Sequence, residues 1–134
     1  MGISQHFQGA SGREYEYQLN GPNFQSVSSQ RGTFVFAQSA NGGPIVLGVG
    51  EARNLNSAFK GAAAIAWQEA QRLGANMLML AIRPNSSEQE RQNEVKDLVL
   101  KHRPPLNDTH KGGLRSRTNP SATGVRDTLR FCVW

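Results

Sequence analysis

The chain has few of the features that define disulfide-rich, zinc-binding or membrane proteins. Its 134 residues include a single cysteine, Cys132, so an internal disulfide is excluded and we expect a reduced, cytoplasmic protein. The three histidines, His6, His102 and His110, lack the spacing of a metal site. No apolar run is long enough to cross a bilayer, and Met1–Ser11 has no apolar core of the kind a signal peptide needs. We therefore expect no membrane partner.

Excess positive charge is missing from most of the chain and concentrated at its end. Through Leu100 there are 8 basic and 8 acidic residues, so the net charge of +5 belongs to residues 101–134. That part carries Lys101, Arg103, Lys111, Arg115, Arg117, Arg126 and Arg130 against Asp108 and Asp127. A basic arm on a neutral body predicts DNA or RNA bound through phosphate, and the alternative is a solvated tail without a partner. No interleaved aromatic pattern for base stacking is present.

Three segments have the composition of β-strands. Arg13–Gln18 alternates charged or polar residues with tyrosine, which predicts a strand with one buried face. Thr33–Gln38 and Ile45–Val49 are rich in branched and aromatic residues, and they flank Asn41-Gly42, a dipeptide that tolerates the positive φ of a tight turn. We therefore expect these two segments to pair as an antiparallel hairpin.

A helix and a central strand are expected next. The helix is capped at Asn54 or Asn56 and stopped by Gly74. Helical spacing places one apolar, alanine-rich face on it, made of Phe59, Ala62, Ala63, Ala66, Ala70 and Leu73. Asn76–Ile82 is nearly all apolar, as in a strand that is covered on both faces.

A second helix begins at the capping box Ser87–Glu90 and ends before Pro104-Pro105. Its apolar stripe consists of Val95, Leu98, Val99 and His102. The chain is thus predicted to be one α+β domain, residues 1–134, with a small, mainly antiparallel sheet and two packed helices.

The last part of the chain is predicted to be a mobile basic loop over residues 112–127, followed by a strand. Thr128–Trp134 alternates apolar and other residues, so an unpaired strand here would leave an exposed edge that is prone to aggregation. We expect it either to pair with the edge of Arg13–Gln18 or to pair with a second copy in a two-fold homodimer.

Several residues occur in the order of a known motif set. Gly32-Thr33-Phe34 stands on the first hairpin strand, Gly48-Val49-Gly50 on the second, and Asn54 opens the following helix. Glu94 lies on the later helix, and Pro104-Pro105-Leu106-Asn107 follows it. This order resembles the GIY-YIG endonuclease family over Gly32–Asn107 and implies its β-β-α-β-α arrangement, with an added N-terminal strand. Gly32, Gly50, Asn54 and Asn107 occupy its motif positions.

Most catalytic groups that this resemblance implies are missing. In the family, two tyrosines and an arginine surround a metal-activated water and the scissile phosphate, while a glutamate holds a divalent ion. Here Phe34, Gly48 and Ala58 stand at the tyrosine and arginine positions, and only Glu94 remains. Loss of acid–base help alone costs about 10²–10⁴ in rate. Glu94 is then either a vestigial carboxylate facing a cleft, binding Mg²⁺ or Mn²⁺ weakly at most, or a solvated residue paired with Arg91 or Lys101.

Three functions remain open. The first is a non-catalytic binding module on a GIY-YIG scaffold, without a cofactor, that contacts nucleic acid through its basic end; candidate contacts are Arg53, Lys60, Arg103, Lys111, Arg115 and Arg117. The second is a divergent endonuclease that uses Mg²⁺ or Mn²⁺, retains Glu94 and has recruited replacements from among Glu51, Arg53, Lys60, His110 and Lys111. The third is a structural dimer module built on Thr128–Trp134.

Overall fold

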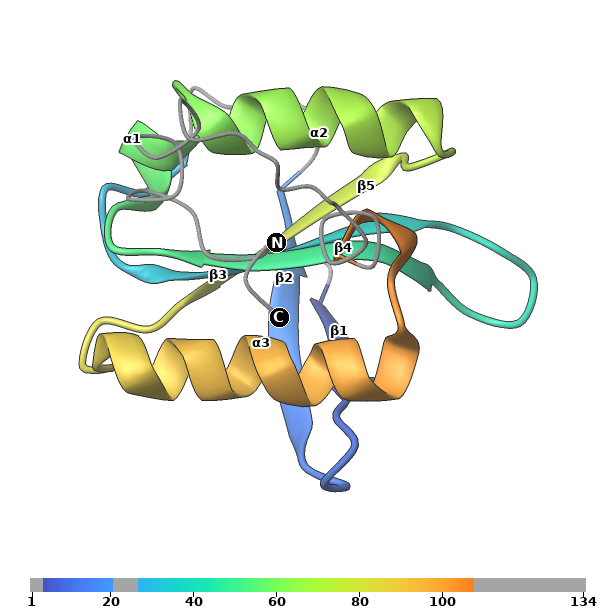
Figure 1. Ribbon diagram of the computed structural model, residues 1–134, viewed down its shortest axis with the longest axis horizontal. Coiled ribbons are helices and arrows are strands. Elements are labelled where there is room, and N and C mark those ends of the chain that lie inside the picture. Colours follow the sequence, from blue (N-terminus) through green and yellow to red (C-terminus); the bar gives the residue numbers. More distant parts are fainter. Residues whose placement is uncertain (1–3, 21–26, 108–134) are drawn as a thin grey trace, which may run out of the picture.

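The computed structural model describes residues 4–20 and 27–107 as an α+β fold with a curled antiparallel sheet. The strands are β1 (Ser4–Gln8), β2 (Glu14–Leu19), β3 (Gly32–Gln38), β4 (Ile45–Ala52) and β5 (Met77–Ile82), in the order β1-β2-β5-β3-β4. The helices are α1 (Leu55–Ala58), α2 (Ala62–Arg72) and α3 (Glu88–His102). Figure 1 shows three layers, with α1 and α2 on one face of the sheet and α3 on the other.

The predicted hairpin is confirmed. β3 and β4 pair antiparallel, with Val35 opposite Val49 and a register shift between Phe36 and Ala37. β5 pairs antiparallel with the other side of β3, with Phe34 opposite Leu80. β3 therefore lies between two strands, and its first six residues are buried.

Each face of the sheet has its own hydrophobic core. On the α1–α2 side, Phe34, Phe36, Phe59 and Trp67 pack together. On the α3 side the core contains Tyr17, Val35, Met79, Val95 and Leu98. β5 contributes Leu78 and Leu80 to the first core and Met79 and Ala81 to the second. The prediction that this strand is covered on both faces is therefore confirmed.

The single helix expected between Asn54 and Gly74 is wrong, because the structure has two. Asn54 caps α1 by accepting a hydrogen bond from the Ser57 N–H at 3.0 Å. The chain then leaves helical geometry, and Gly61 has φ −144° and ψ −115°. Glycine inside a helix costs about 1 kcal/mol relative to alanine, so the break falls where helix is least favoured. Leu73, placed on the buried face by spacing, is 44% exposed because it follows the last turn of α2.

The sequence pattern did not predict β1, whose five residues bury one large apolar side chain, Phe7. β1 pairs along β2 from Ser4 opposite Gln18 to Gln8 opposite Glu14. It therefore occupies the outer edge of β2 that we expected Thr128–Trp134 to use. That segment and the loop 112–127 lie outside the described residues.

α3 begins and ends as predicted. Ser87 and Glu90 form the capping box, and Arg103 follows the last turn with φ 50°. The His102 ring lies at the edge of the stripe, where Nε2 is 2.8 Å from the carbonyl oxygen of Gln8. None of the described helices is long and apolar enough to cross a membrane.

The segment after α3 returns to the edge strand β4. Asn107, fully buried, accepts a hydrogen bond from the Val49 N–H at 3.0 Å and donates one to the Val49 carbonyl at 3.1 Å. The side-chain amide thus acts as one residue of an additional strand. Gly32 and Gly50 also have packing roles, since a Cβ would meet the Ala81 carbonyl at Gly32 and the Phe34 ring at Gly50.

Candidate functional site

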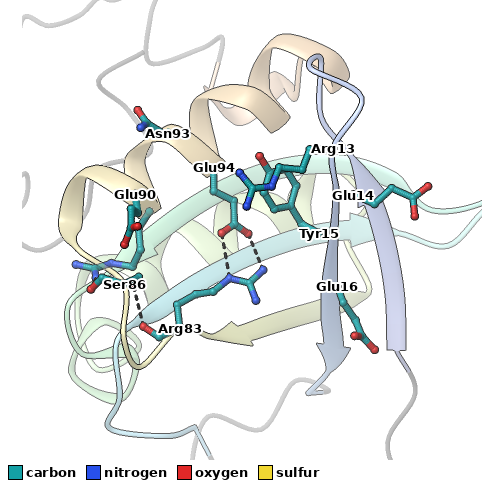
Figure 2. A pocket seen from close by; sticks show the side chains of 10 residues that line it. Arg13, Glu14, Tyr15, Glu16, Arg83, Ser86, Glu90, Asn93 and Glu94 are labelled. Carbon is teal, nitrogen blue, oxygen red and sulfur yellow. Dashed lines mark hydrogen bonds and ion pairs between the residues drawn. The ribbon is translucent and has the colours of Figure 1, made fainter.

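A polar groove of about 410 Å³ lies between β2 and α3. β2 pairs with β5 at Gln18 and Leu19, and the earlier part of β2 forms one wall of the groove. The other wall comes from α3 and from the β5–α3 connection. The lining residues are Arg13, Glu14, Tyr15, Glu16, Arg83, Ser86, Glu90, Arg91, Asn93 and Glu94. Figure 2 shows the side chains of Arg13, Arg83 and Glu94 converging in the groove, while those of Glu14 and Glu16 point away.

Glu94 is the buried acid of this groove, at 6% exposure. Arg83 binds both carboxylate oxygens, with Nε 3.0 Å from Oε1 and Nη2 2.9 Å from Oε2. The Tyr17 hydroxyl donates to Oε2 at 2.6 Å, and the Thr33 hydroxyl donates to the same oxygen at 3.1 Å. One carboxylate on α3 is thus hydrogen-bonded to β2, β3 and the end of β5.

Burial and this carboxylate determine the protonation of the groups around it. Burial, followed by the charge of Glu94, raises the pKa of Tyr17 well above its usual value of 10.0, so the phenol stays neutral and donates. Burial would lower the pKa of Arg83, but the hydrogen bonds and charge of Glu94 outweigh it and the pKa is raised. The Arg83 guanidinium also lies 5.7 Å from the centre of the Tyr17 ring.

A second buried ion pair lies beside the first. Arg91 Nε donates to Glu51 Oε1 at 2.8 Å, and both side chains are 3% exposed. Arg91 Nη1 also donates to the carbonyl and hydroxyl oxygens of Ser86, at 3.1 and 3.0 Å. The alternative in which Glu94 is a solvated residue paired with Arg91 or Lys101 is therefore wrong. Glu94 turns toward the sheet, where Arg83 at the end of β5 reaches it, and Arg91 pairs with Glu51 on β4.

The turn between β1 and β2 is fastened to α3 by Asp97. Its carboxylate accepts hydrogen bonds from the Ser11 N–H at 2.8 Å, the Ser11 hydroxyl at 2.7 Å and the Tyr15 hydroxyl at 2.8 Å. Burial would raise the pKa of Asp97, but these bonds outweigh it and hold the pKa below its usual value. Burial and Asp97 raise the pKa of Tyr15 to about 12. The Arg13 guanidinium lies 5.6 Å from the centre of the Tyr15 ring, so the turn places a cation at the groove.

The positions at which the family resemblance implies lost catalytic groups lie on the opposite face of the sheet from Glu94. Phe34 and Ala58 belong to the core beneath α1 and α2, and a Cβ at Gly48 would meet Leu106 and Phe36 of that same core. Glu94 instead reaches the α3 face. The structure therefore does not bring Glu94 together with Phe34, Gly48 and Ala58.

The residues that do surround Glu94 were not predicted as site residues. Tyr17, Thr33 and Arg83 are 77, 61 and 11 positions away from it in sequence. One signal was available, because the alternation of Arg13–Gln18 already placed Tyr15 and Tyr17 on the buried face of a strand. No group of three or more His, Cys, Asp or Glu side chains within residues 4–20 and 27–107 could hold a metal ion.

The predicted cationic contacts are only partly described. Arg53, Lys60 and Arg103 are exposed, while Lys111, Arg115, Arg117 and His110 lie outside the described residues. The chain matches no model of a protein family, no curated protein and no solved structure. The chemistry of the groove and the charge of the chain are therefore the grounds for a function.

Proposed function

We propose that the chain is a non-catalytic binding module, on a scaffold that resembles GIY-YIG, which contacts nucleic acid through phosphate groups. The non-catalytic part of the proposal rests on Glu94, whose carboxylate oxygens are already hydrogen-bonded within the protein. Arg83 binds both of its oxygens, and Tyr17 and Thr33 add two more donors to one of them. A divalent ion prefers oxygen ligands with open access, and here it would have to displace a guanidinium that already neutralises the carboxylate.

The nucleic-acid part of the proposal is supported by charge. The chain has a net charge of +5, and the excess lies after Leu100, where Lys111, Arg115 and Arg117 are candidate contacts. Because no base-reading pattern is present, binding should be weak and independent of sequence, with a dissociation constant on the order of 10⁻⁴–10⁻⁶ M at physiological salt. The proposal places the protein in the cytoplasm, where a chain with one cysteine needs no disulfide.

The test uses the full chain with labelled single-stranded and duplex oligonucleotides, in buffers containing Mg²⁺, Mn²⁺ or a chelator. We expect binding that weakens steeply with salt and is the same in all three buffers, and we expect intact oligonucleotides after incubation. Metal-dependent cleavage that is lost in Glu94→Gln would contradict the non-catalytic part. Absence of any salt-dependent binding would contradict the nucleic-acid part.

A divergent endonuclease is the second candidate, and one observation favours it. Tyr17, Arg83 and Glu94 bring together a phenol, a guanidinium and a carboxylate, the kinds of group that the family resemblance implies for cleavage. Metal binding separates the candidates, because a nuclease site must accept an ion at Glu94. We expect Mg²⁺ and Mn²⁺ to leave the melting temperature of the full chain unchanged. A metal-induced rise that Glu94→Gln removes would favour the nuclease.

A further inference from the structure

Four neighbouring strands each have an arginine immediately beyond the same end of the sheet. In the sheet order β2, β5, β3 and β4, these are Arg13, Arg83, Arg31 and Arg53. We call these four residues the arginine row. Only Arg53 was predicted as a nucleic-acid contact, although each of the four directly borders a strand in the sequence.

The register of the sheet places three members of the row side by side. Gly32 of β3 pairs with Ala52 of β4 on one side and with Ile82 of β5 on the other. The residues just beyond these pairs are Arg31, Arg53 and Arg83, and the Arg83 N–H donates to the Arg31 carbonyl at 2.9 Å. Adjacent strands lie about 4.8 Å apart, so the three backbones fall within roughly 10 Å. In Figure 1 the start of β3 and the ends of β4 and β5 gather on the left, beside α1 and the first turn of α3.

The guanidinium groups of the row are partly oriented yet still accessible. Arg31 is exposed, and its Nη1 donates to the Ser86 carbonyl at 3.1 Å. Arg13 is exposed and lies over the Tyr15 ring. Arg83 uses Nε and Nη2 for Glu94, and its side chain remains 29% exposed. Such partial ordering lowers the entropy that is lost when a ligand binds.

Two acidic side chains near this end of the sheet are buried, while Glu14, Glu16 and Glu90 are exposed. Glu51 and Glu94 are buried and paired with Arg91 and Arg83. Glu90 lies in the first turn of α3, where its carboxylate accepts the Ser87 N–H of the capping box. A partner can therefore reach Arg31 and Arg53 without meeting the carboxylates of Glu51 and Glu94.

We propose that the arginine row docks the sugar–phosphate backbone of a nucleic acid strand. This rests on the proposed function and adds a surface separate from the basic end of the chain. The two strand spacings between the aligned Arg53, Arg31 and Arg83 cover about 10 Å, over which one strand of a B-form duplex presents about three phosphates. Guanidinium groups match phosphate oxygens in pairs, so arginine suits this contact better than lysine. Arg13 lies over one face of the Tyr15 ring, so that face is not open for base stacking.

The test compares two double variants of the full chain that remove the same charge. Arg31→Ala/Arg53→Ala removes two exposed members of the row and keeps both buried ion pairs. Arg72→Ala/Lys96→Ala is the matched control, since both residues are exposed and lie away from the row on α2 and α3. Fluorescence anisotropy with an oligonucleotide across a salt series gives the slope of log K against log salt. We expect the row variant to lose about 0.7–0.9 of slope per arginine and the control to keep its slope.

Each other outcome counts against the inference. Equal loss of slope in both double variants would show a general charge effect and overturn it. If the row variant kept its salt slope while Arg115→Ala/Arg117→Ala bound more weakly, the arginine row would not be the docking surface, but the proposed function would stand. No binding by the unmodified chain would end the proposed function, and the row with it. If polyglutamate competed as well as an oligonucleotide of equal charge, the partner would be an acidic protein, and the proposal that the row binds nucleic acid would be overturned.

Discussion

At the scale of single residues, Glu94 links α3 to the sheet. Its four hydrogen bonds come from Arg83, Tyr17 and Thr33, and each donor belongs to a different part of the sheet. A carboxylate held in this way joins α3 to the sheet.

Replacement of Glu94 should therefore affect stability first. Glu94→Gln leaves the partly buried Arg83 guanidinium without its counter-charge, and because Arg83 is 29% exposed the loss should fall below the about 3–5 kcal/mol of a fully buried pair. Urea unfolding measures this loss. The control is Glu69→Gln, which breaks the exposed pair with Arg72 and should change stability by at most about 1 kcal/mol. Equal stability of the two variants would show that Glu94 contributes no more than a surface acid.

The two tyrosines of the chain predict an unusual alkaline titration. Burial and neighbouring carboxylates raise the pKa of Tyr15 to about 12 and that of Tyr17 well above 10.0. In the unfolded chain both ionise near pH 10, so above that pH the unfolded state has lost protons that the folded state keeps. Stability from these phenols is complete below pH 10 and falls as pH rises through the folded pKa values.

Ultraviolet absorbance of phenolate tests this directly, because Tyr15 and Tyr17 are the two tyrosines in the sequence. We expect no tyrosine to titrate near pH 10 before the protein unfolds. In Tyr17→Phe the remaining transition reports Tyr15 alone and should be centred at about 12. A full ionisation step near pH 10 in the folded protein would place both rings in solvent and contradict the groove.

At the scale of elements, the β1–β2 turn depends on one acid of α3. Asp97 accepts three hydrogen bonds from Ser11 and Tyr15, and its backbone carbonyl accepts the Ala10 N–H at 3.0 Å. We expect Asp97→Ala to speed amide exchange at residues 9–13 and to lower the pKa of Tyr15 toward its usual value, because two of the causes that raise it are removed.

The control for this variant is Lys96→Ala, which removes the exposed neighbouring side chain on α3. It should leave exchange in the turn unchanged. If Asp97→Ala and Lys96→Ala gave the same exchange rates, the turn would be held by its β1–β2 pairing alone, and Asp97 would have no part in placing Arg13.

Sequence pattern was informative for elements that depend on local chemistry. The hairpin turn, the capping box at Ser87 and the apolar run of β5 each act over a few residues, so the hairpin, α3 and the central strand could be predicted. The positive φ expected at Asn41-Gly42 falls instead on the next residue, Gly43, at 115°. β1 could not, because its one buried apolar residue, Phe7, gives no periodicity. The residues around Glu94 could not be predicted for a related reason. Its ion pair with Arg83 depends on how α3 packs against the end of β5, and local sequence pattern does not give that packing.

At the scale of the whole molecule, two cationic regions sit on a body that is otherwise neutral. Through Leu100 the 8 basic and 8 acidic residues balance, yet the fold buries Glu51 and Glu94 and exposes Arg31 and Arg53. Folding thus pairs the buried acids Glu51 and Glu94 with Arg91 and Arg83 and leaves Arg31 and Arg53 exposed. The basic end of the chain adds a second region, so the proposed function has two independent sources of phosphate contacts.

A double-variant cycle on the full chain tests whether these two regions act on one nucleic acid strand. Arg31→Ala/Arg53→Ala weakens the row, Arg115→Ala/Arg117→Ala weakens the basic end, and the quadruple variant combines them. If each region neutralises its own phosphates, their losses in binding free energy should add to within about 0.3–0.5 kcal/mol, as for distant sites without shared partners. The salt slope of the quadruple variant should fall by the sum of the two separate decreases. Anisotropy titrations give both quantities. If each double variant bound nearly as well as the unmodified chain while the quadruple variant lost far more than their sum, the two regions would be replacing one another at the same phosphates, which contradicts two separate contact surfaces.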